Sequence, residues 1–136
     1  MLRRKDHSRR DALRAISLFS TLPDKTLNAL AEAGRDVRHL PGQTIVKEGG
    51  MGIGFHVIVS GECAVSVGGD QVASIRAGQF FGEMALLENA PRNATVSATT
   101  EVLTFSMDGP QFKWLLERHP EVEERINEVA RERKNN

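Results

Sequence analysis

Residues 80–96 have the sequence Phe-Phe-Gly-Glu-Met-Ala-Leu-Leu-Glu-Asn-Ala-Pro-Arg-Asn-Ala-Thr-Val, and this stretch has the pattern of an anion-binding loop. Gly82 permits a backbone turn that a side chain would hinder, and the good helix formers at 83–87 can begin a short helix there. The N-terminus of such a helix offers free backbone N–H groups to an anionic ligand. Pro91 prevents further helix, and Arg92 brings a donor fork that suits phosphate oxygens.

Short strands are expected on both sides of this loop. They are rich in β-branched residues and are separated by glycine-containing or polar turns. We place these strands at residues 55–59, 62–67, 71–76, 94–99 and 102–107. Strands at spacings of roughly ten residues predict an antiparallel β-roll or jelly-roll, here over residues 35–107, with the loop at 80–96 inside it.

Helical periodicity flanks the strands at both ends of the chain. N-terminal helices are expected over 8–33, and a C-terminal helix pair over 108–134 is divided at His119-Pro120. The fold class is therefore mainly β with flanking helices, and we expect one domain over residues 1–136.

Composition limits the classes of protein that fit. The chain has 136 residues and a formal net charge of zero, so it has no general attraction to nucleic acid or acidic membranes. It has no apolar run near the ~20 residues of a membrane span and no signal peptide, which predicts a cytoplasmic protein. The basic run over residues 1–14 is either a docking patch or a solvated helix face, and the lack of interleaved aromatic residues favours the second.

Enzyme chemistry has little support in the sequence. The histidines at 7, 39, 56 and 119 are scattered without metal-ligand spacing, and no serine or cysteine nucleophile has a recognisable base near it in sequence. Cys63 lies in a strand pattern, where we expect a buried structural thiol. The sequence predicts a protein that is not an enzyme and that has no metal and no cofactor.

Glu83 adds a second requirement to the ligand. A carboxylate beside a phosphate site repels the phosphate. We therefore expect the Glu83 carboxylate to accept a hydrogen bond from a neutral hydroxyl of the same ligand. Ribose offers such a hydroxyl, as in dinucleotide-binding folds. With Arg92 at the other end of the loop, the pair describes a nucleotide monophosphate.

At these residues the chain resembles the cyclic nucleotide-binding domain family. Phe81–Leu87 and Pro91–Val96 are similar to the family's phosphate-binding cassette nearly residue for residue. Further similar landmarks lie at residues 18–22, 41–42, 47–49 and 60–62. The resemblance implies that Glu83 holds the ribose 2′-hydroxyl and that Arg92 holds the cyclic phosphate. It also implies backbone contacts along the loop, and the expected ligand-binding set is completed by Gly82, Met84, Ala85, Asn93 and Ala94.

Two features of the site stay open at this level. Asn93 stands where many family members have alanine or threonine, and its amide can both donate and accept, so the base preference is undecided although the missing hydroxyl favours cyclic AMP over cyclic GMP. The base is expected to be covered from the C-terminal helix. The candidates are Ile126 and Val129 by packing and Arg131 and Arg133 by stacking.

The resulting hypothesis is a stand-alone regulatory sensor that couples ligand binding to repacking of the C-terminal helix. The alternative is a β-roll that has lost the ligand and serves as a structural or protein-interaction module. The chain ends two residues after Lys134, without a DNA-recognition helix pair, so the expected output is an unidentified effector protein or self-association.

Overall fold

The computed structural model describes residues 8–50, 54–82 and 94–134. It divides the chain into two compact units. One unit is Gly34–Phe112, which we call the roll, and the other is Met1–Ala33 together with Lys113–Asn136, which we call the helical unit. The expectation of a single domain over 1–136 stays a prediction.

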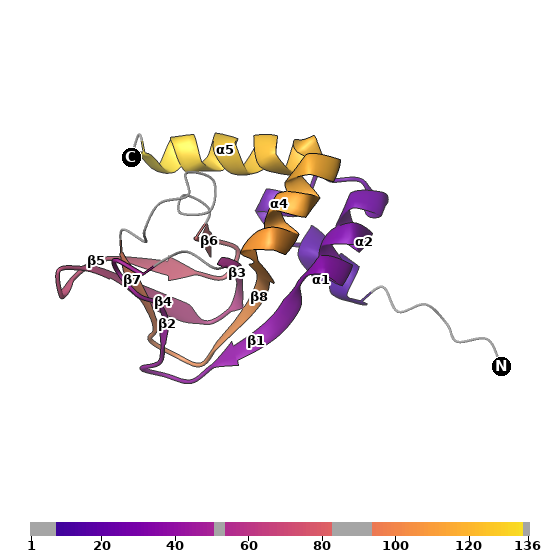
Figure 1. Ribbon diagram of the computed structural model, residues 1–136. Helices are drawn as coiled ribbons and strands as arrows, with labels where there is room; N and C mark the ends of the chain where they lie inside the picture. The colour runs from indigo at the N-terminus through magenta and orange to yellow at the C-terminus, as the bar shows by residue number, and fades with distance from the viewer. Residues whose placement is uncertain (1–7, 51–53, 83–93, 135–136) are drawn as a thin grey trace. The chain divides into compact units, whose positions relative to one another are not determined.

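The roll consists, in its described residues, of two four-stranded antiparallel sheets (Figure 1). The first sheet has the order β1 (Arg35–His39), β8 (Val102–Asp108), β3 (Gly54–Ser60), β6 (Phe80–Phe81). The second sheet has the order β2 (Thr44–Val46), β7 (Thr95–Ala98), β4 (Glu62–Val67), β5 (Asp70–Arg76). This arrangement confirms the fold class expected from the sequence.

The tight turn between β4 and β5 shows how local sequence determines the register. Gly68 and Gly69 have φ values of 61° and 89°, a conformation that costs glycine little. Val67 then faces Asp70 across the turn. The glycine-containing turn expected between the strands at 62–67 and 71–76 is therefore confirmed as a hairpin.

An aromatic group fills one side of the first sheet within the roll. The ring of Phe55 stacks on that of Phe112 at 4.6 Å between centroids and lies 5.7 Å from that of Phe80. The ring of Phe105 lies so close to Gly34 that a Cβ at Gly34 would be 2.2 Å from it. All four rings are buried, so this group is a major part of the core of the roll.

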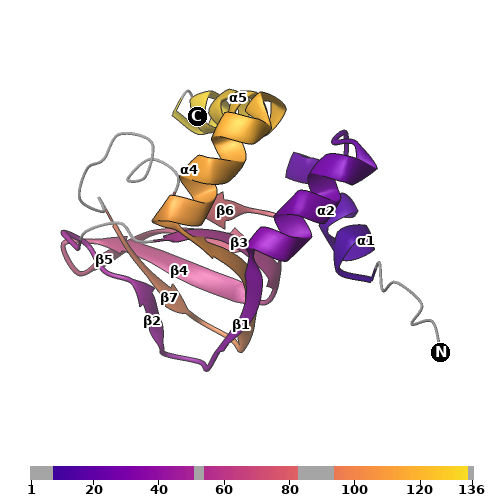
Figure 2. The same cartoon turned by 45° about the vertical axis from the view of Figure 1, so that its right-hand side comes forward.

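The helical unit is built from both ends of the chain. Its described elements are α1 (Ser8–Arg14), the 3-10 helix η1 (Ser17–Phe19), α2 (Asp24–Ala33), the Lys113–Arg118 part of α4 (Gly109–Arg118), and α5 (Pro120–Lys134). Helices α1 and α2 lie side by side (Figure 2), and α5 contacts η1. Its buried apolar residues are Leu13, Ile16, Leu18, Phe19, Leu22, Leu27, Leu30, Leu115, Leu116, Val122 and Ile126. None of the helices in the described part of the chain is long and apolar enough to span a membrane.

The helices form where the sequence expected them because caps and breaks define their ends. Asp108 accepts a hydrogen bond at 2.8 Å from the N–H of Gln111 at the start of α4. Helix α4 ends before His119, and Pro120 begins α5, a position that proline favours. From the basic N-terminal run, Arg14 donates to the carbonyl of Leu22 at 3.1 Å, which is a structural use of that side chain.

A polar contact joins the two chain segments of the helical unit. The buried hydroxyl of Thr26 on α2 donates to Oε1 of Glu121 on α5 at 2.8 Å. Nδ1 of His119 lies 3.5 Å from the same carboxylate oxygen. We call these three residues the clasp. Their hydrogen bonds connect residues 95 positions apart in the sequence.

Candidate functional site

The predicted binding loop begins in the first sheet and returns to the second. Strand β6 ends at Phe81 and is followed by Gly82, while Ala94 precedes β7. Gly82 has φ of 99°, the left-handed conformation for which the sequence indicated a glycine. The expected ligand-binding residues Glu83, Met84, Ala85, Arg92 and Asn93 lie outside the described residues, as does the short helix expected at 83–87. Their roles stay predictions.

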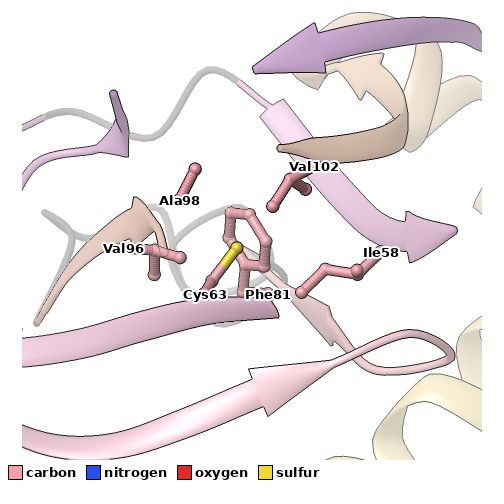
Figure 3. Packing of buried hydrophobic residues seen from close by; sticks show 6 residues of the cluster. All are labelled: Ile58, Cys63, Phe81, Val96, Ala98 and Val102. Atoms are coloured by element: carbon pink, nitrogen blue, oxygen red, sulfur yellow. The ribbon is translucent and has the colours of Figure 1, made fainter. Parts of the chain in front are cut away.

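One apolar cluster holds both ends of this loop (Figure 3). Phe81, just before Gly82, and Val96, two residues after Ala94, are both buried and belong to the cluster. Its other buried members come from both sheets and are Ile58, Cys63, Ala98 and Val102. Because its two ends are fixed in one packed core, the loop is attached to a rigid frame rather than to two independent strands.

Polar contacts also hold the strand that follows the loop. The hydroxyl of Thr95 accepts a hydrogen bond from the N–H of Glu48 at 2.9 Å. The carboxylate of Glu48 in turn accepts one from the N–H of Gly68 at 3.0 Å. The start of β7 is thus tied to the end of β2 and to the β4–β5 turn. The sequence gave no sign of this contact.

A row of hydrogen-bonded polar side chains crosses the first sheet. Nε2 of His39 lies 3.1 Å from Oγ1 of Thr104, which lies 2.9 Å from Oγ of Ser106. Oγ of Ser106 lies 2.7 Å from Nδ1 of His56. We call His39, Thr104, Ser106 and His56 the polar row. At its far end the imidazole of His56 stacks on Phe81, with 5.0 Å between ring centroids.

The polar row shares its face of the sheet with the apolar cluster. Thr104 and Ser106 alternate with buried apolar residues on β8, and Val102 of the cluster is on the same face, two positions before Thr104. Sequence reasoning missed the row because it treated the histidines as scattered. The available signal was the pair of polar residues at alternate positions of a strand whose other residues are mostly apolar.

Burial determines the protonation of two groups in the roll. It lowers the pKa of His39, so this imidazole stays neutral at neutral pH. It also raises the pKa of the Cys63 thiol, and the neighbouring Glu62 carboxylate raises it further. The expected buried thiol is confirmed, and an elevated pKa disfavours the reactive thiolate.

The lid candidates lie on α5 in the helical unit. Ile126 is fully buried there, and Val129 is partly buried. Arg131 is exposed, and nothing is described of the Arg133 side chain. In this arrangement Ile126 is a core residue of the helical unit, so using it to cover a base requires α5 to repack. Their role as a lid stays a prediction.

A pocket of about 390 Å³ in the helical unit does not suit the predicted ligand. Its lining includes the carboxylates of Glu121, Glu124 and Glu128, which repel a phosphate. Its Arg125 is held by Glu128 at 3.5 Å and by the carbonyl of Leu18 at 3.4 Å. Among the described residues, no three His, Cys, Asp or Glu side chains are grouped as metal ligands.

Comparison with known proteins assigns most of the roll, including the loop segment, to a known family. Residues 36–119, well over half of the chain, match the family model of the cyclic nucleotide-binding domain. The chain belongs to this family. The matched segment contains both sheets and the loop at 80–96, apart from the first residue of β1.

Curated relatives come from more than one kind of regulated protein. The chain is 39% identical over 108 residues to the cAMP-dependent protein kinase regulatory subunit of Colletotrichum orbiculare, covering 78% of this chain and 28% of that protein. It is 37% identical over 134 residues to a cyclic nucleotide-gated potassium channel of Rhizobium etli, covering 98% of this chain and 38% of that protein. The chain therefore spans well under half the length of either relative.

Solved structures share the fold over most of the chain. The regulatory domain of Toxoplasma gondii PKA, crystallised with cAMP, superposes with a TM-score of 0.80 at 25% identity, covering 91% of this chain and 49% of that one. The regulatory subunit of a cAMP-independent protein kinase A from Trypanosoma brucei superposes with a TM-score of 0.76 at 26% identity, covering 88% and 47%. The fold thus occurs in a regulatory domain crystallised with cAMP and also in the regulatory subunit of a cAMP-independent kinase.

Proposed function

We propose that this chain is a sensor module that binds cyclic AMP, in preference to cyclic GMP, at the loop of residues 80–96. The observation that carries the proposal is the loop sequence itself, with Glu83 and Arg92 in a chain whose family binds cyclic nucleotides. The frame around the loop supports it, because Phe81 and Val96 fix both loop ends in one core. The T. gondii domain crystallised with cAMP supports the choice of ligand.

The loop chemistry assigns a role to each end of the ligand. Arg92 neutralises the cyclic phosphate with a charged donor fork, and Glu83 accepts from the ribose 2′-hydroxyl. Gly82, Met84, Ala85 and Ala94 offer backbone N–H groups along the loop. Asn93 lacks the hydroxyl that helps to select guanine in family members, which supports adenine as the base.

The output is a change in the packing of α5. Ligand binding shifts the population toward an arrangement in which Ile126 or Val129 covers the base, and the shift is limited by the difference in ligand affinity between the two arrangements. The receiver is a separate effector, a second copy of the chain or an attached segment. The relatives include both a kinase regulatory subunit and a channel, so the family supports more than one receiver.

Calorimetry with cyclic AMP and cyclic GMP tests the ligand directly. We expect Arg92→Ala to weaken cyclic AMP binding by about 10- to 100-fold, because it removes a charged hydrogen bond to phosphate. Arg76→Ala is the matched control, since Arg76 is an exposed arginine of the same roll at 3.9 Å from Glu62. No binding of either nucleotide by the wild type at millimolar concentration ends the proposal.

The second candidate is a regulatory roll that responds to no cyclic nucleotide. The relative from a cAMP-independent kinase favours it, because that protein shares the fold. A thermal-shift series separates the two candidates. A binder is stabilised by mass action as ligand increases, whereas the alternative melts at the same temperature with and without cyclic nucleotide.

A further inference from the structure

The pocket in the helical unit has a chemistry opposite to that of the predicted nucleotide site. It has a volume of about 390 Å³, and we call it the acidic groove. Its described lining belongs entirely to the helical unit and shares no residue with the loop at 80–96. Leu22, which is buried, and Pro23 supply an apolar wall, and α5 supplies the charges.

Three glutamates on one face of α5 line the acidic groove. Glu121, Glu124 and Glu128 lie within about 60° around the helix and span about 10 Å along it. The first ten residues of α5 contain four glutamates and one arginine, although the whole chain has no net charge. Negative charge is therefore concentrated at the groove, which favours a cationic partner.

The three carboxylates differ in the contacts that they already make. Glu121 accepts a hydrogen bond from Thr26, and Glu128 lies 3.5 Å from Arg125, so both are positioned by their own unit. Glu124 is exposed, and within the described part of the chain it forms no ion pair. The groove thus has one carboxylate that can pair with a visiting cation without breaking an existing ion pair.

The backbone beside the groove already binds two guanidinium groups. Nε of Arg125 donates to a carbonyl of η1 at 3.4 Å, and its Nη1 lies 3.5 Å from Glu128. Nη1 of Arg14 donates to the carbonyl of Leu22 at 3.1 Å, and its Nη2 contacts the carboxylate of Asp24. Each guanidinium therefore uses one backbone carbonyl together with one carboxylate. This combination suits the planar donor fork of arginine better than the compact ammonium group of lysine.

We propose that the acidic groove is the docking site for an extended, arginine-containing segment of a partner protein. One arginine lays its aliphatic stem on Leu22 and Pro23 and pairs with Glu124. Two arginines three positions apart in an extended segment are about 10 Å apart, which matches the length of the row of glutamates. The site goes beyond the proposed nucleotide function, because docking here needs neither the loop nor its ligand.

The first experiment uses a synthetic peptide as the probe. The peptide acetyl-Ala-Arg-Leu-Ala-Arg-Ala-amide has two arginines three positions apart, and the control peptide has glutamine at both positions. Calorimetry with the full chain compares them without nucleotide. We expect the arginine peptide to bind at least about tenfold more tightly than the glutamine peptide, and to lose affinity as salt screens the charges. A wild type that does not distinguish the two peptides ends this proposal.

The second experiment compares two neighbouring glutamates of α5. Glu123 is exposed like Glu124 but does not line the groove, so Glu123→Lys changes the net charge equally and is the matched control. We expect Glu124→Lys to weaken binding of the arginine peptide about tenfold and Glu123→Lys less than about twofold. Thermal melting checks that both variants fold, and Glu124→Gln, with an expected loss of about threefold, is the milder variant. Equal losses in the two lysine variants would mean a diffuse attraction to an acidic helix and would overturn the site.

NMR amide shifts locate the bound peptide. Docking predicts shifts at residues 21–23 together with residues 121–128, the two segments that line the groove. Shifts confined to α5 overturn the groove, and displacement of the peptide by an equal concentration of spermidine overturns the selectivity for arginine. Sedimentation of the chain alone tests a second occupant, since a dimer that Glu124→Lys dissociates would place another copy of the chain in the groove instead of a partner protein.

These outcomes are separate from those of the proposed function. A chain that binds the arginine peptide but no cyclic nucleotide keeps the docking site and ends the proposed function. A chain that binds cyclic AMP but not the peptide ends the docking site alone.

Discussion

The roll and the helical unit use polar contacts in different ways. In the roll, the polar row joins mostly buried hydrogen-bonding groups on adjacent strands, next to an apolar cluster. In the helical unit, the clasp joins segments far apart in the sequence through Glu121, whose side chain is 42% exposed. Hydrogen bonds such as those of the polar row are shielded from solvent and favour one arrangement of the side chains. A hydrogen bond to a partly exposed carboxylate, as in the clasp, is weaker and depends on pH and salt. The difference suits a rigid site on the roll and a helical unit that can repack.

The largest effect expected is on the core of the roll. Phe55→Ala removes a fully buried ring that stacks on Phe112 at 4.6 Å, and should lower the free energy of unfolding by about 3–5 kcal/mol. Urea denaturation measures it. Val72→Ala is the control, since Val72 is 61% exposed on β5 of the same roll and should change stability by less than about 0.5 kcal/mol. A loss below about 1 kcal/mol for Phe55→Ala would contradict the assignment of this ring to a rigid core.

Much of the roll could be predicted because its signals are local. Runs of β-branched residues separated by a glycine-containing turn predicted β4 and β5, and His119-Pro120 predicted the division between α4 and α5. The positive φ of Gly82 agrees with the prediction that the chain turns there in a conformation that a side chain would hinder. These features depend on a few neighbouring residues, whose steric limits and hydrogen-bonding groups are known before the chain folds.

The polar row and the clasp could not be predicted because they depend on register and on distant segments. His56 meets Ser106 only because β3 pairs with β8 in one register, and a slip of one residue would turn either side chain to the other face. Thr26 meets Glu121 across 95 positions, with no repeat or motif to connect them. A single sequence contains the residues of such contacts but not their pairing.

A smaller effect is expected from breaking the clasp. Thr26→Val keeps the shape of the buried side chain but removes the hydroxyl that donates to Glu121 at 2.8 Å, which should cost about 1 kcal/mol because the carboxylate can turn to water. Urea denaturation followed by the fluorescence of Trp114, which belongs to the helical unit, measures it. Arg38→Ala is the control, because its pair with Glu101 at 3.3 Å is exposed and should contribute less. Equal losses in the two variants would remove the distinction between the clasp and a surface ion pair.

The smallest effect expected is the acid response of the clasp. The backbone N–H of Glu121 and then the Thr26 hydroxyl lower the pKa of the Glu121 carboxyl by hydrogen bonding to it. A carboxylate with a lowered folded-state pKa stabilises the fold above its unfolded pKa of about 4.3, and this contribution is lost as pH falls through the folded-state value. The stability difference between the wild type and Glu121→Gln should therefore shrink from about pH 5 to 3, by less than about 1 kcal/mol because the group is partly exposed.

The Thr26→Val background sharpens this measurement. Removing the Thr26 hydroxyl removes one of the hydrogen bonds that lower the pKa of the Glu121 carboxyl. In this background, the stability difference caused by Glu121→Gln should therefore depend less on pH. Urea denaturation of the four proteins at a series of pH values gives the coupling directly. An acid dependence of equal size in both backgrounds would mean that the Thr26 bond does not stabilise the charged form of Glu121. The clasp would then join the chain ends without making the helical unit more sensitive to pH than the roll.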